Sequence, residues 1–447
     1  MPAPRTLLYL NFDFPPMSGP GIWRALGFIK YLPDHNWRTI VVCSDRSPSR
    51  DRFDPSLAAQ IPANTEVHRL HSWFENDILL AMERVAERTS VKLLSRLMLG
   101  VHWRFRRDWP DYLFNWTLKA ARVGAWLAFR QKPDCLFTSG PPHLAHAAGR
   151  FINRLTGIPW VMDYRDLWTD DDVQVKPTRY RDRIARIERS SVARCEAVTG
   201  VSPVHLDIVA KRFANVKPRD RFFLIRNGHD LPDAVIERSL FQPRNAQMHV
   251  HFNGTPQVTH PFLLILDLLD RLPSEQRPLF TFTGLPPRVK EAVEQRGYQQ
   301  YVQDVGHMSQ MASVDYSTQC DVLLAMVNAA SPVYRGTIPG KVYEAIALGR
   351  HLLAVLPRGS TVGDLIDDPR TGTMVDVEDF DALYRALLRL LELHRTGQLN
   401  ADQDPARRRA LAERHSRKHQ TAQLVELLDF VTRRRAQPPG FSLAARP

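Results

Sequence analysis

Short apolar runs alternate with amphipathic segments along almost the whole chain. In the first half, each apolar run has the length of a strand, and the segments between runs show the 3.6-residue spacing of helices. Apolar runs without polar alternation are typical of parallel strands that helices cover on both faces. The pattern therefore predicts a parallel sheet with strands at 6–12, 38–43, 65–70, 134–139, 158–163 and 197–201.

The second half repeats this plan, with strands predicted at 222–225, 249–253, 279–283, 302–305, 321–327, 351–355 and 373–375. A chain of 447 residues exceeds one ordinary core, and Asn227-Gly228 marks a turn near a boundary. The fold class we predict is α/β, with two Rossmann-like doubly wound domains that face a cleft. We assign residues 1–220 to the first domain, 221–403 to the second, 404–435 to helices that pack back toward the first, and 436–447 to a disordered tail.

Composition and charge narrow the classes of function. Hydrophobic residues make up 44% and charged residues 24%, as in soluble globular proteins, and no apolar run reaches the roughly 18–20 residues of a membrane span. We expect no signal peptide and a cytoplasmic location. The four cysteines are far apart, which favours buried thiols over disulfides or a metal site. A net charge of +12 favours anionic partners, and no nucleic-acid-binding module is recognised.

The stretch 332–349, PVYRGTIPGKVYEAIALG, carries the most chemistry. A loop rich in Gly and Pro runs into a short apolar helix, on which Lys341 and Glu344 are three residues apart and share a face. The amino end of a helix offers unpaired N–H groups and a positive dipole, which suit phosphate. A cation beside a carboxylate could hold a diphosphate and a sugar or ribose hydroxyl. The alternative is an ordinary helix start with an exposed ion pair.

Polar residues also follow an apolar strand of the first half. Asp163, Arg165 and Asp166 come at its carboxyl end, where open parallel sheets bind ligands. We predict that these residues face a site. The alternative is a structural ion pair, for example between Asp166 and Arg165.

Two loops of the first half carry further candidates. Gly19 and Gly21 lie between the first strand and a helix, and glycines let the backbone approach a ligand closely. Arg24, one turn into that helix, is a candidate anion contact. His143 opens a helix after two prolines and could reach a ligand, or its polar groups could simply face solvent.

These motifs together resemble a known family. In the first domain the resemblance rests on FPPMSGPGIWR (14–24), TSGPP (138–142) and GIPWVMDYRDLW (157–168). In the second it rests on RNGHD (226–230), FNGT (252–255), DVGHMS (304–309), QCDVLL (319–324) and PGKVYEAIALG (339–349). The chain resembles nucleotide-sugar glycosyltransferases of the two-Rossmann-domain (GT-B) type, and most closely the retaining transferases of family 4, which build bacterial polysaccharides and lipid-linked glycans.

The resemblance implies an enzyme of hexosyltransferase type. It would move a sugar from a nucleotide diphosphate sugar to a hydroxyl of a glycan or lipid-linked acceptor, with retention, without a metal and without a cofactor, in cell-surface polysaccharide or glycan biosynthesis. The implied donor-binding residues are Gly19, Gly21, Arg24, Gly254, Gly284, His307, Arg335, Gly336, Thr337, Ile338, Lys341 and Glu344. The implied catalytic residues are Asp163, Arg165, Asp166 and Lys341, and the implied acceptor-binding residues are His143 and Arg165.

The sequence departs from the family pattern in the second domain. Gly336 stands where the family has an acidic residue, and Thr255 and His260 stand where it has a basic pair. These departures motivate one alternative, a non-catalytic descendant that binds a nucleotide. A second alternative is a sugar-nucleotide epimerase of the same architecture.

A basic stripe in the first half bears on location. Arg84, Arg88, Lys92 and Arg96 recur every four residues, with apolar and aromatic neighbours. A helix of this kind can lie on an anionic membrane surface, which would suit a lipid-linked acceptor at the inner face of the cell membrane. The alternative is a solvated helix face.

Overall fold

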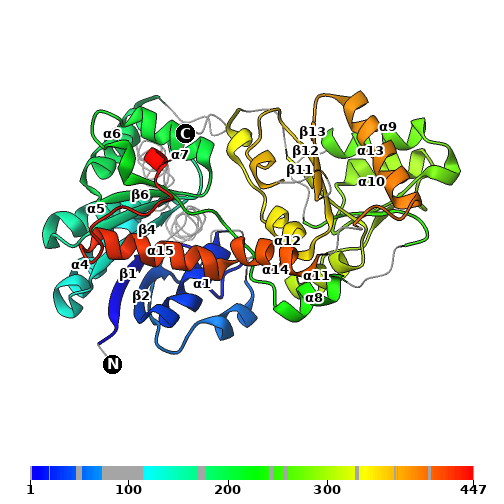
Figure 1. Cartoon of the computed structure of the whole chain (residues 1–447). Helices are drawn as coiled ribbons and strands as arrows, with labels where there is room; N and C mark the ends of the chain where they lie inside the picture. The colour runs from blue at the N-terminus through cyan, green and yellow to red at the C-terminus, as the bar shows by residue number, and fades with distance from the viewer. Residues whose placement is uncertain are drawn as a thin grey trace, which may run out of the picture. The chain divides into compact units, whose positions relative to one another are not determined.

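The chain forms two compact units in the computed structural model (Figure 1). Unit 1 comprises residues 1–226 and 420–447, and unit 2 comprises residues 227–419. The structure describes residues 3–19, 21–46, 53–72, 114–169, 178–240, 245–254, 260–327, 332–366, 369, 371–400 and 404–445. In this part of the chain, no helix is both long and apolar enough to cross a membrane.

Unit 1 is built on a parallel sheet of seven strands in the order β3-β2-β1-β4-β5-β6-β7. The strands are β1 (Arg5–Leu10), β2 (Trp37–Ser44), β3 (Glu66–Leu70), β4 (Cys135–Gly140), β5 (Trp160–Tyr164), β6 (Ala197–Gly200) and β7 (Phe222–Leu224). Strands β1 and β4 are neighbours, and the chain leaves them toward opposite edges of the sheet. This change of direction is the switch point at which open parallel sheets bind ligands.

Helices pack on this sheet through apolar faces. They are α1 (Ile22–Tyr31), α4 (Phe114–Gln131), α5 (Leu144–Thr156), α6 (Thr178–Arg194), α7 (Pro203–Arg212) and α15 (Arg417–Val431). Ser202 caps α7 with its side chain, and Gly157 ends α5 in the left-handed conformation. Helix α15 joins α1 in one core cluster, where the Thr421 hydroxyl donates to the Gly27 carbonyl oxygen (Figure 1).

Unit 2 has a parallel sheet of six strands in the order β10-β9-β8-β11-β12-β13. The strands are β8 (His249–Phe252), β9 (Leu279–Phe282), β10 (Val302–Asp304), β11 (Val322–Met326), β12 (His351–Leu356) and β13 (Gly372–Asp376). Its helices are α8 (Asp233–Leu240), α9 (His260–Arg271), α10 (Pro287–Gln295), α11 (Gln310–Thr318), α12 (Gly340–Leu348), α13 (Phe380–Arg395) and α14 (Pro405–Arg414). The switch point of this sheet lies between β8 and β11.

The predicted fold class is confirmed, because both units are α/β with a doubly wound parallel sheet. One strand changes place. Residues 222–225, predicted to open the second domain, form β7 of the first sheet, paired with β6. The boundary predicted at 220/221 therefore moves to 226/227. Helix α8 was not predicted, because its eight residues give too short a periodic pattern.

The end of the chain also differs from the prediction. The segment 404–435 is divided: α14 packs on α12 in unit 2, while the apolar side chains of α15 enter the core of unit 1. The tail predicted to be disordered is ordered as far as residue 445. The Leu224 amide donates to the Phe441 carbonyl oxygen, and Leu443 is buried. This tail covers β7, the edge strand of the sheet, whose backbone groups need partners.

Candidate functional site

Helix α12 begins beside the switch point of unit 2. Six of its residues are buried: Val342, Tyr343, Ala345, Ile346, Ala347 and Leu348. The 3.6-residue spacing therefore leaves Lys341 and Glu344 together on another face. The helix has Pro339 at its N-cap and Gly349 in the left-handed conformation at its C-cap. No acidic residue occupies its first turn, so the positive end of its dipole is not compensated locally.

The Lys341 ammonium lies against the end of β8. Its Nζ atom is 3.2 Å from the centroid of the Phe252 ring, a cation–π contact. Gly254 follows with φ of +130°, and a Cβ atom there would lie 3.3 Å from Nζ. Burial lowers the pKa of Lys341 to about 7, although the nearby Glu344 carboxylate acts in the opposite direction. The described residues offer this cation a ring face and no hydrogen-bonded carboxylate.

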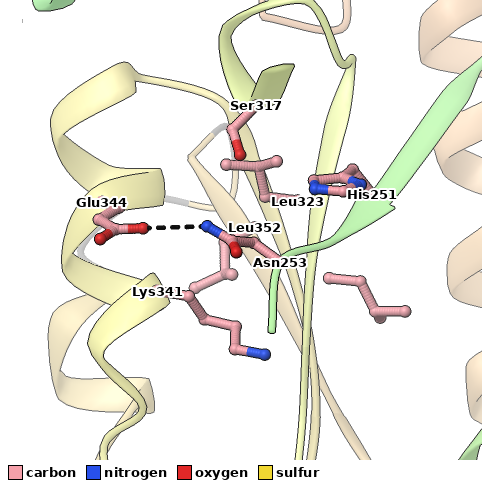
Figure 2. Close-up of a pocket in the computed structure, with 8 residues that line it drawn as sticks. His251, Asn253, Ser317, Leu323, Lys341, Glu344 and Leu352 are labelled. Atoms are coloured by element: carbon pink, nitrogen blue, oxygen red, sulfur yellow. Dashed lines mark hydrogen bonds between the residues drawn. The ribbon is translucent and has the colours of Figure 1, made fainter. Parts of the chain in front are cut away.

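The Glu344 carboxylate is oriented by polar side chains of neighbouring elements. Asn253 donates from Nδ2 to Glu344 Oε2 over 3.4 Å (Figure 2). The Ser313 hydroxyl donates to Asn253 Oδ1 over 2.6 Å, and Gln310 of α11 also hydrogen-bonds to Glu344. Burial raises the pKa of Glu344, while Arg417 and Lys341 act to lower it. Glu344 is thus a fixed, partly buried acceptor for hydroxyl groups.

A small pocket joins these groups (Figure 2). Its polar lining comes from Lys341, Glu344, Asn253, His251 and Ser317, and three leucines close the rest. His251 faces Thr281 across β8 and β9, and its Nδ1 atom is 2.8 Å from the Thr281 hydroxyl. Burial lowers the pKa of His251 to about 4, so the ring is neutral near pH 7. Its buried Nε2 atom has no hydrogen-bond partner in the described part of the chain.

His251, Asn253, Gln310 and Ser313 were not among the predicted site residues. A signal for the first two exists, because both lie at the carboxyl end of β8, inside or beside the FNGT motif. Gln310 and Ser313 are on α11, and nothing in the local pattern links that helix to α12.

Two other predicted donor residues of unit 2, Gly284 and His307, follow strands that are one and two places from β8 in the sheet. Gly284 follows β9, and the backbone N–H of Gly254 donates to Thr283 beside it. His307 follows the edge strand β10 and is exposed. The turn before α12 contains the remaining predicted donor residues: Arg335, Gly336, Thr337 and Ile338. The Thr361 amide, from outside this turn, donates to the Arg335 carbonyl oxygen. The structure thus brings Gly254, Lys341 and Glu344 together and leaves His307 on a distant strand of the same edge.

In unit 1, Asp163 and Arg24 form a buried ion pair rather than two separate ligand contacts. Asp163 accepts from Arg24 Nε at 3.0 Å and Nη2 at 2.7 Å. Strand register places Ser139 and Thr199 on either side of it, and both hydroxyls donate to it at 2.7 Å. Burial by itself would raise the pKa of Asp163, but the Arg24 guanidinium and these hydrogen bonds hold it below its usual value.

The other predicted residues of unit 1 have different surroundings. The side chain of Arg165 is buried against Gly21, and Gly19 has φ of +143°. Asp166 is exposed. His143, at the start of α5, stacks on Trp168 with ring centroids 5.4 Å apart, and its Nε2 atom is 3.2 Å from the Leu167 carbonyl oxygen. The pairing of Arg165 with Asp166, the alternative in the sequence analysis, is not found among the described side chains.

Three predicted features lie outside the described residues. They are the basic stripe of Arg84, Arg88, Lys92 and Arg96, Thr255, and the side chain of His260.

The fold is that of GT-B glycosyltransferases. Solved structures with this fold include a glycosyltransferase from Rickettsia africae (TM-score 0.65, 13% identity, covering 96% of this chain and 98% of that one). Sucrose-phosphate synthase from Thermosynechococcus elongatus gives a TM-score of 0.63 at 15% identity, covering 96% and 100% of the two chains. HepE of Anabaena in complex with UDP and glucose gives 0.59 at 12% identity, covering 95% and 99%.

The match to a protein family covers almost only unit 1. Residues 21–228 match the model of the glycosyl transferase 4-like domain. A comparison with curated protein sequences gives no match. The resemblance to GT-B glycosyltransferases of the family 4 type is therefore confirmed, by the family model over residues 21–228 and by the fold over nearly the whole chain.

Proposed function

We propose that this protein transfers a hexosyl group from a nucleotide diphosphate sugar to an acceptor hydroxyl, with retention of configuration. The observation that carries the proposal is the ammonium of Lys341 at the amino end of α12, beside the carboxyl end of β8. Its pKa near 7 means that the protein itself stabilises this cation poorly. A diphosphate would supply the missing negative charge.

The other groups of unit 2 suit the remaining parts of a nucleotide sugar. Glu344, held by Asn253, is an acceptor for ribose hydroxyls. Arg335 and the backbone N–H groups of Gly336 and Ile338 would add to the neutralisation of the diphosphate. The Thr337 N–H already donates to the Tyr334 carbonyl oxygen. Gly254, Gly284 and His307 would line the base and phosphates.

In unit 1, the Asp163–Arg24 pair gives these two residues a positioning role in the proposal. The pair fixes the start of α1 relative to β5, because Arg24 lies in the first turn of that helix. Gly19 and Gly21 lie on a loop that would face both the donor diphosphate and the acceptor, and His143 and Arg165 would contact the acceptor. Asp166 is exposed and stays available to a substrate.

The chemistry would depend on charge stabilisation. Cleavage of the sugar–phosphate bond builds positive charge on the sugar and negative charge on the leaving phosphate oxygen. Lys341 and the amino end of α12 would stabilise that oxygen more in the transition state than in the ground state. This arrangement calls for no metal, no cofactor and no enzyme nucleophile, because the departing phosphate can assist attack by the acceptor on the same face.

We also propose that the protein acts at the inner face of the cell membrane, on a glycan or lipid-linked acceptor of cell-surface polysaccharide synthesis.

A surface of helices α4 and α5, the α4/α5 face, supports this location. The two helices touch where Gly124 meets Ile152. Neither helix contains Asp or Glu. Five large apolar side chains on them are exposed: Leu118, Trp126, Phe129, Phe151 and Leu155. Their five basic residues are Lys119, Arg122, Arg130, Arg150 and Arg154. Exposed aromatic residues among cations suit an anionic bilayer surface.

Release of free nucleotide from a panel of nucleotide sugars tests the proposal. With the correct donor and an acceptor hydroxyl, we expect turnover with retained anomeric configuration. Glu344→Ala and Lys341→Ala should each weaken donor binding at least tenfold, since each removes a charged hydrogen-bond partner. Exposed Arg385→Ala, in the same unit, is the matched control.

Other outcomes point to the alternatives. Interconversion of sugars without transfer would identify an epimerase. Tight nucleotide binding with no turnover of any donor would identify a non-catalytic nucleotide-binding protein. Unchanged donor affinity in both site variants would remove the site itself.

A further inference from the structure

Arg165 is a buried cation whose guanidinium has no ion-pair partner among the described residues. The residue is 8% exposed, and its Nε and Nη1 atoms are buried without a hydrogen-bond partner in the described chain. Its backbone N–H donates to the Gly140 carbonyl oxygen, which fixes the residue at the carboxyl end of β5. Buried guanidinium groups are normally paired, because desolvating unsatisfied N–H donors is costly.

The nearest carboxylate of the same strand is already used. Asp163 accepts two hydrogen bonds from Arg24 and one from each of two hydroxyls, which leaves it saturated. Asp166, the next acidic residue, is exposed, and no ion pair joins it to Arg165 among the described side chains. The two buried donor atoms of Arg165 therefore lack an acceptor.

Gly21 makes room for this guanidinium. A Cβ atom at position 21 would lie 1.9 Å from Arg165 Nη1 and 2.8 Å from its Cζ atom. The backbone angles of Gly21, φ −69° and ψ −21°, are ordinary for any residue. A side chain at position 21 would therefore have to displace the Arg165 guanidinium, although the backbone there could hold any residue.

The guanidinium also lies at the amino end of a helix. Gly21 is the N-cap of α1, a helix of ten residues with no side-chain cap and no acidic residue in its first turn. The positive end of the helix dipole and a planar array of N–H donors thus meet at one place, beside the unit 1 switch point. Both features attract an oxyanion, and no described acidic side chain hydrogen-bonds to the Arg165 guanidinium or caps α1.

We infer that Arg165 and the amino end of α1 bind an anionic group of the acceptor, either a phosphate or a carboxylate. The inference rests on the proposed function, since it assigns the donor diphosphate to Lys341 in unit 2. Arg165 is a second buried cation without a hydrogen-bonded carboxylate among the described side chains, and it lies in unit 1. It therefore suits the acceptor, which is the second substrate. The acceptor class is accordingly an anionic one: a sugar phosphate, a lipid-linked phosphate or a sugar acid.

Titration calorimetry of the full chain tests this site. With UDP at saturation to fill the donor site, inorganic phosphate and glucuronate are the probes. Arg165→Gln and Gly21→Ala should each weaken binding of the preferred probe at least tenfold, the first by removing the charge and the second by displacing it. Arg165→Lys should recover part of the affinity. Exposed Arg186→Gln in α6 is the control, and circular dichroism establishes that each variant is folded.

The outcomes separate the sources of the anion and the two proposals. Preference for phosphate indicates a phosphorylated or lipid-phosphate acceptor, and preference for glucuronate indicates a sugar acid. UDP affinity should stay within twofold of the wild type in Arg165→Gln. An equal loss of UDP affinity would give Arg165 to the donor and overturn the inference, as would unchanged probe binding in both variants. If the wild type fails to bind UDP while phosphate binding still depends on Arg165, the proposed function fails and the anion site stands.

Discussion

Lys341 shows how one residue links burial to binding. Its ammonium packs on Phe252 in a partly buried position, which lowers its pKa to about 7 from an ordinary value of 10.5. The charged form is therefore unfavourable in the unliganded protein and favourable beside a diphosphate. Affinity and stability should then depend on this residue in opposite ways, as often happens at functional sites.

The pH dependence of donor binding follows from this shift. Binding of an anion favours the protonated lysine, so affinity should fall as pH rises above about 7, by up to about tenfold per pH unit. The measurement is calorimetry between pH 6 and 9 with the tightest-binding nucleotide sugar of the panel, whose diphosphate does not titrate in this range. Lys341→Arg, which stays charged, should flatten the curve.

Thermal unfolding gives the companion result. Unfolded, Lys341 is charged up to about pH 10.5, whereas the folded protein favours its neutral form above about 7. Lys341→Met should therefore raise the Tm most at pH 6, with the gain shrinking toward pH 10. A lower Tm at pH 6 would contradict the assigned cost of this charge.

At the scale of elements, α12 positions the pocket. It begins next to β8 and ends at Gly349, whose φ of +62° suits glycine. The Arg408 guanidinium of α14 donates to the Gly349 carbonyl oxygen over 2.7 Å. A Cβ atom at 349 would lie 2.5 Å from Arg408 Cζ. The end of α12 is therefore fixed from two sides.

Gly349→Ala tests this arrangement. The left-handed backbone alone should cost about 1 kcal/mol of unfolding free energy, and displacement of Arg408 should add to it. Gly297→Ala is a matched control in the same unit, because Gly297 has φ of +69° and no neighbour within 4 Å of a Cβ atom. Denaturant unfolding should show a larger loss for position 349. Equal losses would mean that the contact with Arg408 adds nothing.

At the scale of the whole molecule, charge and exposed apolar surface combine. The chain carries a net charge of +12, and the α4/α5 face adds aromatic side chains to a surface without acidic residues. Electrostatic attraction would bring the protein to an anionic bilayer, and insertion of the rings would hold it there.

Cosedimentation with vesicles measures this. Binding to phosphatidylglycerol vesicles should exceed binding to phosphatidylcholine vesicles and should weaken as salt is added. Trp126→Ser with Phe129→Ser should reduce binding roughly tenfold or more. Burial of each ring in the bilayer would contribute about 1.5–3 kcal/mol to the free energy of binding. Met311→Ser, at an exposed position in unit 2, is the control. Equal binding by the wild type and the double variant would rule out this face.

The sequence by itself determined most of the elements and one half of the site. Strands and helices follow from local periodicity, and Lys341 and Glu344 share a face because residues three apart on a helix always do. Position at the carboxyl end of a strand was likewise readable for Asp163 and Gly254.

Only the tertiary structure decided which polar side chains of the site have hydrogen-bond or ion-pair partners. Arg24 pairs with Asp163 across 139 residues, and Asn253 meets Glu344 across 91. It also placed 222–225 in the first sheet and left Arg165 against Gly21 without an acceptor. These facts depend on strand order and register, which bring together residues that no local pattern relates.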